Sequence, residues 1–297
     1  MDLTPRNFSD YELIDSGNFE KLERFGNYML ARPEPQAIWD RALPEAEWKK
    51  LYHAQFRKNP LGRENGNSQE RGEWVLKKEM PEQWTVKVEY RSMQAEIRLG
   101  LTSFGHIGMF PEQAENWKFI FDTVDELKHE KPIILNLFAY TGIASLSASA
   151  AGAQVYHVDS VKQVVSWARE NMEKNRMGNI HWIVEDAMKF VQREVKRGKQ
   201  YHGIILDPPA YGRGPQGEKW LLEKQINEMV QLCSRLLHPR NSFFMLSMYS
   251  LGLSPLISGN LVNSHFKGLH DCESGELYVP DRAGRKLPLG TYLRFRK

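Results

Sequence analysis

The fold of this chain is decided by the stretch IILNLFAYTG at residues 133–142, in which an apolar run passes through a turn into a helix of small residues. The same order of an apolar run followed by a helical segment repeats to about residue 246. Such alternation predicts βαβ units, and hence a parallel sheet with helices on both faces. We predict strands at 133–138, 154–158, 180–184, 201–206 and 242–246, and helices at 142–151, 161–175, 187–197 and 219–237.

The C-terminal residues add an antiparallel element to this sheet. Residues 276–279 and 291–295 flank a segment that contains Gly and Pro, so we expect them to pair as a hairpin. The predicted fold class is therefore α/β, a doubly wound sheet with a C-terminal antiparallel hairpin, over a domain at residues 111–297. A helix is expected at its start, over 111–128, where Trp117 and Phe121 follow helical spacing.

Residues 1–110 differ in character and predict a small N-terminal α+β domain. Residues 84–90 and 94–99 alternate apolar and polar side chains, which is typical of a half-exposed antiparallel sheet. Residues 1–60 are rich in Trp, Pro and mixed charge and have poor periodicity. The Gly, Pro and polar residues of 59–72 predict a loop.

Composition sets broad limits on the class of protein. The 297 residues are 41% hydrophobic and 26% charged, and the net charge of +3 gives no strong electrostatic argument for a polyanionic partner. The two cysteines, Cys233 and Cys272, suffice for neither a disulfide framework nor a metal quartet. Because we find no apolar signal core and no membrane-length apolar run, we expect a cytoplasmic protein with no membrane and no metal partner.

Candidate ligand residues follow four successive strands. Gly142, Asp159, Asp186 and Asp207 each stand where a predicted strand ends. In open α/β sheets ligands bind at the carboxyl ends of the strands. A helix that begins near Gly142 points its N–H groups at this edge, and the glycine lets the backbone approach a ligand. No G-x-G-x-x-G motif is present, so a ligand with one carboxylate is favoured over a dinucleotide.

The acidic residues have both a functional and an ordinary interpretation. Asp159 could accept both hydroxyls of a ribose, and Asp186 or an adjacent N–H could bind the amino group of adenine. Each could equally be the N-cap of the helix that follows. Asp207 is the first residue of DPPAY at residues 207–211. This segment could clamp a planar group that carries an amine, or it could form a turn with a solvated carboxylate.

Together these motifs resemble the class I S-adenosylmethionine-dependent methyltransferases, whose sheet is Rossmann-like. The sequence is more similar still to the 23S ribosomal RNA methyltransferase-like group, which carries N-L-F-[AS]-Y-T-G, here residues 136–142. The similarity extends over GHIGMFPEQ at 105–113, Asp159, EDA at 185–187 and LDPP at 206–209. It covers roughly residues 100–297.

The resemblance implies that S-adenosylmethionine is the cofactor. Phe138 and the turn through Gly142 would hold the methionine moiety, Asp159 the ribose, and Asp186 the adenine. Residues 110–113 would close over the cofactor from the side of the small domain. The implied cofactor-binding residues are Phe110, Glu112, Gln113, Asn136, Phe138, Tyr140, Thr141, Gly142, Asp159, Asp186, Ala187 and Asp207.

The acceptor side would be formed by Asp207, Pro208, Pro209 and Tyr211. Hydrogen bonds from an exocyclic amine to Asp207 and the Pro208 carbonyl would orient the nitrogen, and Tyr211 would stack on the base. In the usual amine-methylating motif the tyrosine follows the second proline directly, whereas here Ala210 is inserted. Tyr211 could therefore be a surface residue of a Gly-rich loop at 211–217 instead.

Methylation at cytosine C5 is the alternative chemistry, and it needs a cysteine thiolate. Related C5 enzymes carry Ser-Cys-Ser after the fifth strand, where this chain has SMYS at residues 247–250. Cys233 is expected to be a buried helix residue, and Cys272 lies beyond the motifs. We therefore predict that neither is a nucleophile, which disfavours C5 chemistry.

RNA, and ribosomal RNA in particular, is the acceptor that the resemblance implies. Basic residues with interleaved tryptophans suit single-stranded nucleic acid, although they could also form a solvated face over packed tryptophans. A protein or small-molecule acceptor, or a cofactor-binding protein without catalysis, stays open. The residues of this basic cluster are Arg57, Lys58, Arg63, Arg71, Lys77 and Lys78, with Trp74 and Trp84.

Overall fold

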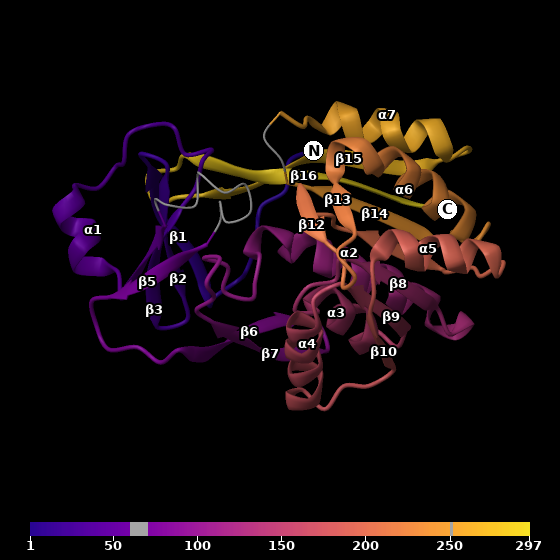
Figure 1. Ribbon diagram of the computed structural model, residues 1–297, viewed down its shortest axis with the longest axis horizontal. Helices are drawn as coiled ribbons and strands as arrows, with labels where there is room; N and C mark the ends of the chain where they lie inside the picture. The colour runs from indigo at the N-terminus through magenta and orange to yellow at the C-terminus, as the bar shows by residue number, and fades with distance from the viewer. Residues whose placement is uncertain (60–70, 250–251) are drawn as a thin grey trace. The chain divides into compact units, whose positions relative to one another are not determined.

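A computed structural model describes residues 1–59, 71–249 and 252–297 (Figure 1). Most of the predicted loop at 59–72 lies outside these residues, and so do Arg63 and Ser250. The chain divides into two compact units. Unit 1 comprises residues 1–3, 115–277 and 289–297, and unit 2 comprises residues 4–114 and 278–288.

Unit 1 is built on a seven-stranded sheet of the order β10-β9-β8-β11-β14-β16-β15. The first five strands in this order run parallel, and β16 is antiparallel to β14. The predicted doubly wound sheet and its C-terminal hairpin are therefore confirmed. The strands are β8 (Ile133–Leu137), β9 (Gln154–Asp159), β10 (Ile180–Val184), β11 (Gly203–Leu206), β14 (Phe243–Met248), β15 (His270–Pro280) and β16 (Lys286–Arg296).

Helices follow the strands and cover both faces of this sheet. They are α2 (Ala114–Leu127), preceded by the 3-10 turn Pro111–Gln113 and followed by Lys128–Glu130, and α3 (Ile143–Ala150), α4 (Lys162–Lys174), α5 (Ala187–Lys196), α6 (Leu222–Leu236) and α7 (Pro255–His265). Among the helices of the described part, none combines the length and the apolar composition that a membrane crossing requires.

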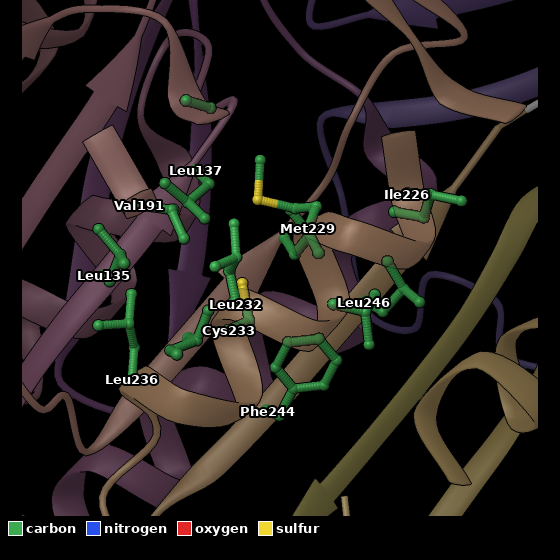
Figure 2. Close-up of a cluster of buried hydrophobic side chains, with 14 of the residues drawn as sticks. Leu135, Leu137, Val191, Ile226, Met229, Leu232, Cys233, Leu236, Phe244 and Leu246 are labelled. Atoms are coloured by element: carbon green, nitrogen blue, oxygen red, sulfur yellow. The ribbon is translucent and has the colours of Figure 1, made fainter. Parts of the chain in front are cut away.

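Two adjacent phenylalanines of β14 show that the helices lie on opposite faces. Successive strand residues point to opposite sides of a sheet. The Phe243 ring packs against Phe119 of α2, with centroids 5.8 Å apart. The Phe244 ring packs against Phe266, directly after α7, with centroids 4.8 Å apart. Phe244 also belongs to a buried cluster formed by β8, β11, α5 and α6, part of which is drawn in Figure 2.

One predicted helix begins later than expected. Residues Lys219–Leu221 form a short strand, β13, which pairs antiparallel with β12 (Tyr211–Arg213). The helix α6 therefore starts at Leu222, whose N–H donates to the Ala210 carbonyl at 3.0 Å. Periodicity favoured a helix through this segment because residues 219–221 continue the apolar pattern of α6, whereas their pairing partner lies just before the Gly- and Pro-containing residues 214–218.

Unit 2 contains a five-stranded sheet that the sequence did not reveal. Its strands are β1 (Tyr11–Gly17), β2 (Glu20–Phe25), β3 (Tyr28–Pro33), β4 (Ala54–Lys58) and β5 (Gly72–Leu76), in that order, with α1 (Glu45–Leu51) between β3 and β4. The predicted antiparallel pair is confirmed as β6 (Gln83–Tyr90) and β7 (Met93–Gly100). It alternates buried and exposed side chains as expected.

Buried charged residues explain why the first sheet was missed. Glu23 and Arg32 are buried on neighbouring strands, where Arg32 Nε donates to Glu23 Oε2 at 2.8 Å. Asp15 is buried too, and accepts hydrogen bonds from the Leu43 N–H at 3.0 Å and the Trp48 indole at 2.6 Å. A sequence pattern counts these charges as exposed, whereas the tertiary structure pairs them inside.

Candidate active site

The strand order of unit 1 gathers the predicted strand-end residues at one edge of the sheet. The strands β10, β9, β8 and β11 are neighbours and run parallel, so their carboxyl ends meet there. The turn at 138–142 and Asp159, Asp186 and Asp207 follow these four ends. Phe110, Glu112 and Gln113 belong to unit 2, and their contact with the cofactor stays a prediction.

The turn after β8, which we call the cofactor turn (residues 138–142), has a constrained backbone. Phe138 and Tyr140 adopt left-handed conformations with φ of 55° and 50°. Each such non-glycine residue costs roughly 1–3 kcal/mol, and the conformation persists only where the surrounding structure enforces it. Here the Ala139 N–H donates to the Val158 carbonyl at 3.1 Å, which holds the turn against β9.

Buried polar side chains support the cofactor turn. Asn136 Nδ2 donates to Ser145 Oγ at 2.9 Å, and Ser145 Oγ lies 3.0 Å from His157 Nδ1. Burial lowers the pKa of His157 to about 3, so its imidazole is neutral near pH 7. On α4, Asn171 Nδ2 donates to the Thr141 carbonyl at 3.1 Å. Asn136 is only 2% exposed and its amide is engaged, so direct binding of the cofactor by Asn136 stays a prediction.

Gly142 closes the turn at a place where a side chain does not fit. Its φ is +89°, and an added Cβ would lie 3.0 Å from the Ala168 Cβ on α4. The sequence suggested that this glycine lets the backbone approach a ligand. The structure supplies a second reason for it, the close packing between the start of α3 and α4.

Asp159 joins the cofactor turn to the start of α4. Its Oδ2 accepts the Tyr140 N–H at 3.0 Å, and its Oδ1 accepts the Val161 N–H at 2.9 Å. Burial raises the pKa of Asp159, while the N–H groups of Val161 and Tyr140 act in the opposite direction. The side chain is still partly exposed, and a carboxylate oxygen can accept a second hydrogen bond. The arrangement fits a vicinal diol such as that of ribose.

Asp186 and Ala187 begin α5. Asp186 is the N-cap, and its Oδ1 accepts the Lys189 N–H at 3.0 Å, so the ordinary interpretation of this residue holds. The Ala187 side chain is buried in the core of unit 1. A contact of either residue with adenine stays a prediction.

The acceptor turn (residues 207–211) follows β11. Asp207 is partly exposed, Pro208 is buried, and Pro209 is exposed. The Pro209 carbonyl accepts the Trp220 indole N–H at 2.7 Å. The ring of Tyr211 is exposed on β12, and its hydroxyl accepts a hydrogen bond from Arg213 Nε at 2.9 Å.

Trp220 is a site residue that the sequence analysis missed. It lies on β13, is 3% exposed, and packs against Phe138 of the cofactor turn with ring centroids 4.8 Å apart. It therefore contacts the cofactor turn through its ring and the acceptor turn through its indole N–H. The only signal in the sequence was a tryptophan at the edge of a predicted helix, 13 residues after Asp207 (220 − 207).

Neither cysteine has the environment of a nucleophile. Cys233 is buried among apolar side chains of α6 and the sheet, as Figure 2 shows, and burial raises its pKa. Cys272 lies on the outermost strand, β15, and burial and the neighbouring Glu273 raise its pKa. Three strand spacings, roughly 14 Å, separate β15 from β11.

The two tryptophans of the basic cluster in unit 2 pack against other residues of that unit. Trp84 is buried, and its indole N–H donates to the Phe25 carbonyl at 3.2 Å. Trp74 packs on Phe56 and donates to the Thr102 carbonyl at 2.8 Å. The exposed members among the described residues are Arg57, Lys58, Arg71, Lys77 and Lys78.

Comparison with known proteins identifies the family. A family model described as "Conserved hypothetical protein 95" matches residues 110–233. The crystal structure of the SAM dependent methyltransferase from Agrobacterium tumefaciens is 35% identical, covers 100% of this chain and 93% of its own, and superposes with a TM-score of 0.89. The chain belongs to the S-adenosylmethionine-dependent methyltransferases, and its cofactor is S-adenosylmethionine.

Curated relatives point to a narrower group. The ribosomal RNA large subunit methyltransferase K/L of Shewanella frigidimarina is 28% identical over 158 residues, which are 52% of this chain and 21% of that protein. The protein of the same name from Hahella chejuensis is 33% identical over 108 residues, 35% of this chain and 15% of that protein. The chain thus spans about a fifth or less of the length of these curated relatives.

Proposed function

We propose that this protein methylates RNA, ribosomal RNA foremost, at an exocyclic amine of a base. The observation that carries the proposal is the acceptor turn, an Asp-Pro-Pro sequence that follows β11 directly beside the cofactor turn after β8. The names of the ribosomal RNA methyltransferases that match this chain support RNA as the acceptor. We assign the reaction to residues 111–297 and keep residues 1–110 as a separate small domain.

The cofactor turn and Asp159 have the groups that S-adenosylmethionine needs. Asp159 would accept the ribose hydroxyls, and the backbone of residues 138–142 would surround the methionine moiety. When bound, the cofactor supplies an activated methyl group, so the protein has mainly to position the acceptor.

The acceptor turn can supply that positioning. The lone pair of an exocyclic amine is delocalised into the base, so its nitrogen attacks well only when its N–H bonds are held in the right direction. The Asp207 carboxylate and the Pro208 carbonyl would accept these two N–H groups. The Pro209 carbonyl is already engaged by Trp220, which leaves the carbonyl of Pro208 as the backbone acceptor in this proposal.

A transfer assay tests the acceptor class. The purified protein is incubated with S-adenosylmethionine labelled in its methyl group and with total RNA from a strain that lacks the gene. We expect label in RNA, and a methylated amine among the nucleosides after digestion. Label that enters only protein or small molecules would overturn the RNA assignment, and 5-methylcytidine would overturn the amine assignment.

Two further measurements separate the alternatives. The double variant Cys233→Ser with Cys272→Ser should keep its transfer activity, because neither thiol takes part in methylation of an amine. Isothermal titration with S-adenosylmethionine and with its demethylated product should show binding of both. Binding without transfer to RNA, protein or small molecules would indicate a cofactor-binding protein without catalysis.

A further inference from the structure

The two-stranded ribbon of β12 and β13 has two different faces. In its register Tyr211 lies opposite Leu221, Gly212 opposite Trp220, and Arg213 opposite Lys219. Directly opposed residues share a face, and successive residues alternate. Because Trp220 is buried against Pro209 and Phe138, Gly212 and Trp220 form the inner face.

The outer face of the ribbon is formed by the other two pairs. Tyr211, Arg213 and Lys219 are exposed, and Leu221 is half-buried. We call this set the ribbon face. It combines an aromatic ring, 50% exposed, with two cationic side chains, and it begins two residues after Pro209 (211 − 209).

The opposed cations are the informative feature of the ribbon face. Arg213 and Lys219 lie directly opposite each other, where like charges repel, and Arg213 Nε donates to the Tyr211 hydroxyl at 2.9 Å on the same face. The acidic residue next to Lys219 is Glu218, which forms an ion pair with Lys189 of α5 and accepts the Gln216 N–H at 2.9 Å. An anion bound between the two cations would convert their repulsion into attraction.

We propose that the ribbon face binds the sugar–phosphate backbone of the RNA strand next to the target nucleotide. Arg213 and Lys219 would contact phosphates, and Tyr211 would stack on a base, a combination that suits single-stranded nucleic acid. Trp220 fixes the ribbon to the acceptor turn through the hydrogen bond to Pro209. This inference rests on the proposed action on RNA and adds the surface that holds the strand.

Salt dependence tests the proposal. The probe is a fluorescein-labelled single-stranded RNA oligonucleotide of mixed sequence, and its binding is measured by fluorescence anisotropy at several salt concentrations. For single strands each phosphate contact contributes about 0.7 to the slope of log K against log salt. The variant Arg213→Ala with Lys219→Ala should therefore reduce the slope by about 1.4 and weaken binding roughly ten-fold or more at 0.1 M salt.

A charge-matched control is available on the same unit. Lys196 ends α5 and Lys199 follows it, and both are exposed at the end of that helix remote from Asp186. The variant Lys196→Ala with Lys199→Ala removes the same charge and should leave the slope unchanged. Titration with S-adenosylmethionine should give the wild-type affinity for both double variants, which shows that the cofactor site is intact.

The outcomes distinguish failure of this inference from failure of the proposed function. If the wild type binds and methylates RNA but the ribbon variant keeps the wild-type slope, the ribbon proposal is wrong and the RNA function stands. An equal reduction of the slope in the ribbon variant and in the Lys196→Ala with Lys199→Ala variant would indicate a non-specific effect of charge. That result would also overturn the ribbon proposal. If the wild type neither binds nor methylates RNA, the proposed function fails and the ribbon proposal fails with it.

Discussion

The cofactor turn and the acceptor turn follow adjacent parallel strands, but they are held in different ways. The cofactor turn is flanked by the buried and mutually hydrogen-bonded Asn136, Ser145 and His157, and its Tyr140 N–H donates to Asp159. The acceptor turn is held from the segment that follows it, where the Trp220 indole N–H donates to the Pro209 carbonyl and the Leu222 N–H donates to the Ala210 carbonyl.

This difference suits the two tasks. A cofactor of constant shape is bound best by a preorganised backbone, which loses little freedom on binding. In our proposal an acceptor base must enter and leave, and the groups that would receive it lie on a turn with exposed residues at its end. A substitution on either turn should therefore disturb one side and leave the other intact.

The Asp207→Ala variant should have the largest effect and should act on catalysis. Without the carboxylate an amine nucleophile is no longer oriented, so we expect the rate of methyl transfer to fall more than 100-fold. The affinity for S-adenosylmethionine, measured by titration, should fall far less. A loss confined to cofactor binding would assign Asp207 to the cofactor side instead.

The Asp159→Ala variant should act on the opposite side. It removes the acceptor of the Tyr140 and Val161 N–H groups and, in our proposal, of the ribose hydroxyls. Loss of these charged hydrogen bonds should cost about 2 kcal/mol, or roughly 30-fold in affinity for S-adenosylmethionine and for its demethylated product. The Asp159→Asn variant, which keeps one carbonyl oxygen, should lose less. Unchanged affinity in both variants would contradict the assignment.

His157 should make the cofactor side sensitive to acid. The unfolded chain protonates this residue near its ordinary pKa of 6.5, whereas the folded protein resists protonation down to a pKa of about 3. Its stabilising contribution is therefore complete above pH 6.5 and is lost as the pH falls. Between pH 6.5 and pH 5 the free energy of unfolding of the wild type should fall about 1.6 kcal/mol more than that of His157→Gln. Denaturant unfolding at both pH values measures this, and parallel curves would contradict it.

The Trp220→Phe variant should have the smallest effect. It keeps an aromatic ring against Phe138 and removes the N–H that holds the Pro209 carbonyl, a loss of about 1 kcal/mol. We expect kcat to fall roughly five-fold while cofactor affinity stays within about two-fold. Trp220→Ala should weaken both, since the ring contact is lost as well. Equal effects of the two variants on cofactor binding would show that the ring contact with Phe138 has no separate role.

Prediction from sequence succeeded where the pattern is local. The strands and helices predicted between residues 133 and 246 follow periodicities of neighbouring residues, and the structure places their bounds within a few residues of those expected. The hairpin strands β15 and β16 are longer than predicted, and α7 was not predicted. The prediction of a helix was wrong for residues 219–221, which form a strand by pairing with residues 211–213. Prediction from sequence missed the first sheet of unit 2, because Asp15, Glu23 and Arg32 are charged and yet buried.

By itself, the sequence determined the doubly wound sheet and the residues that follow its strands, since alternation and turn chemistry are properties of adjacent residues. Only the tertiary structure decided what supports those residues: Ser145 and His157 beneath the cofactor turn, Trp220 between the two turns, and the opposed Arg213 and Lys219 on the ribbon face. These contacts join segments that are distant along the chain or meet across a strand pair, and they form only when the chain has packed.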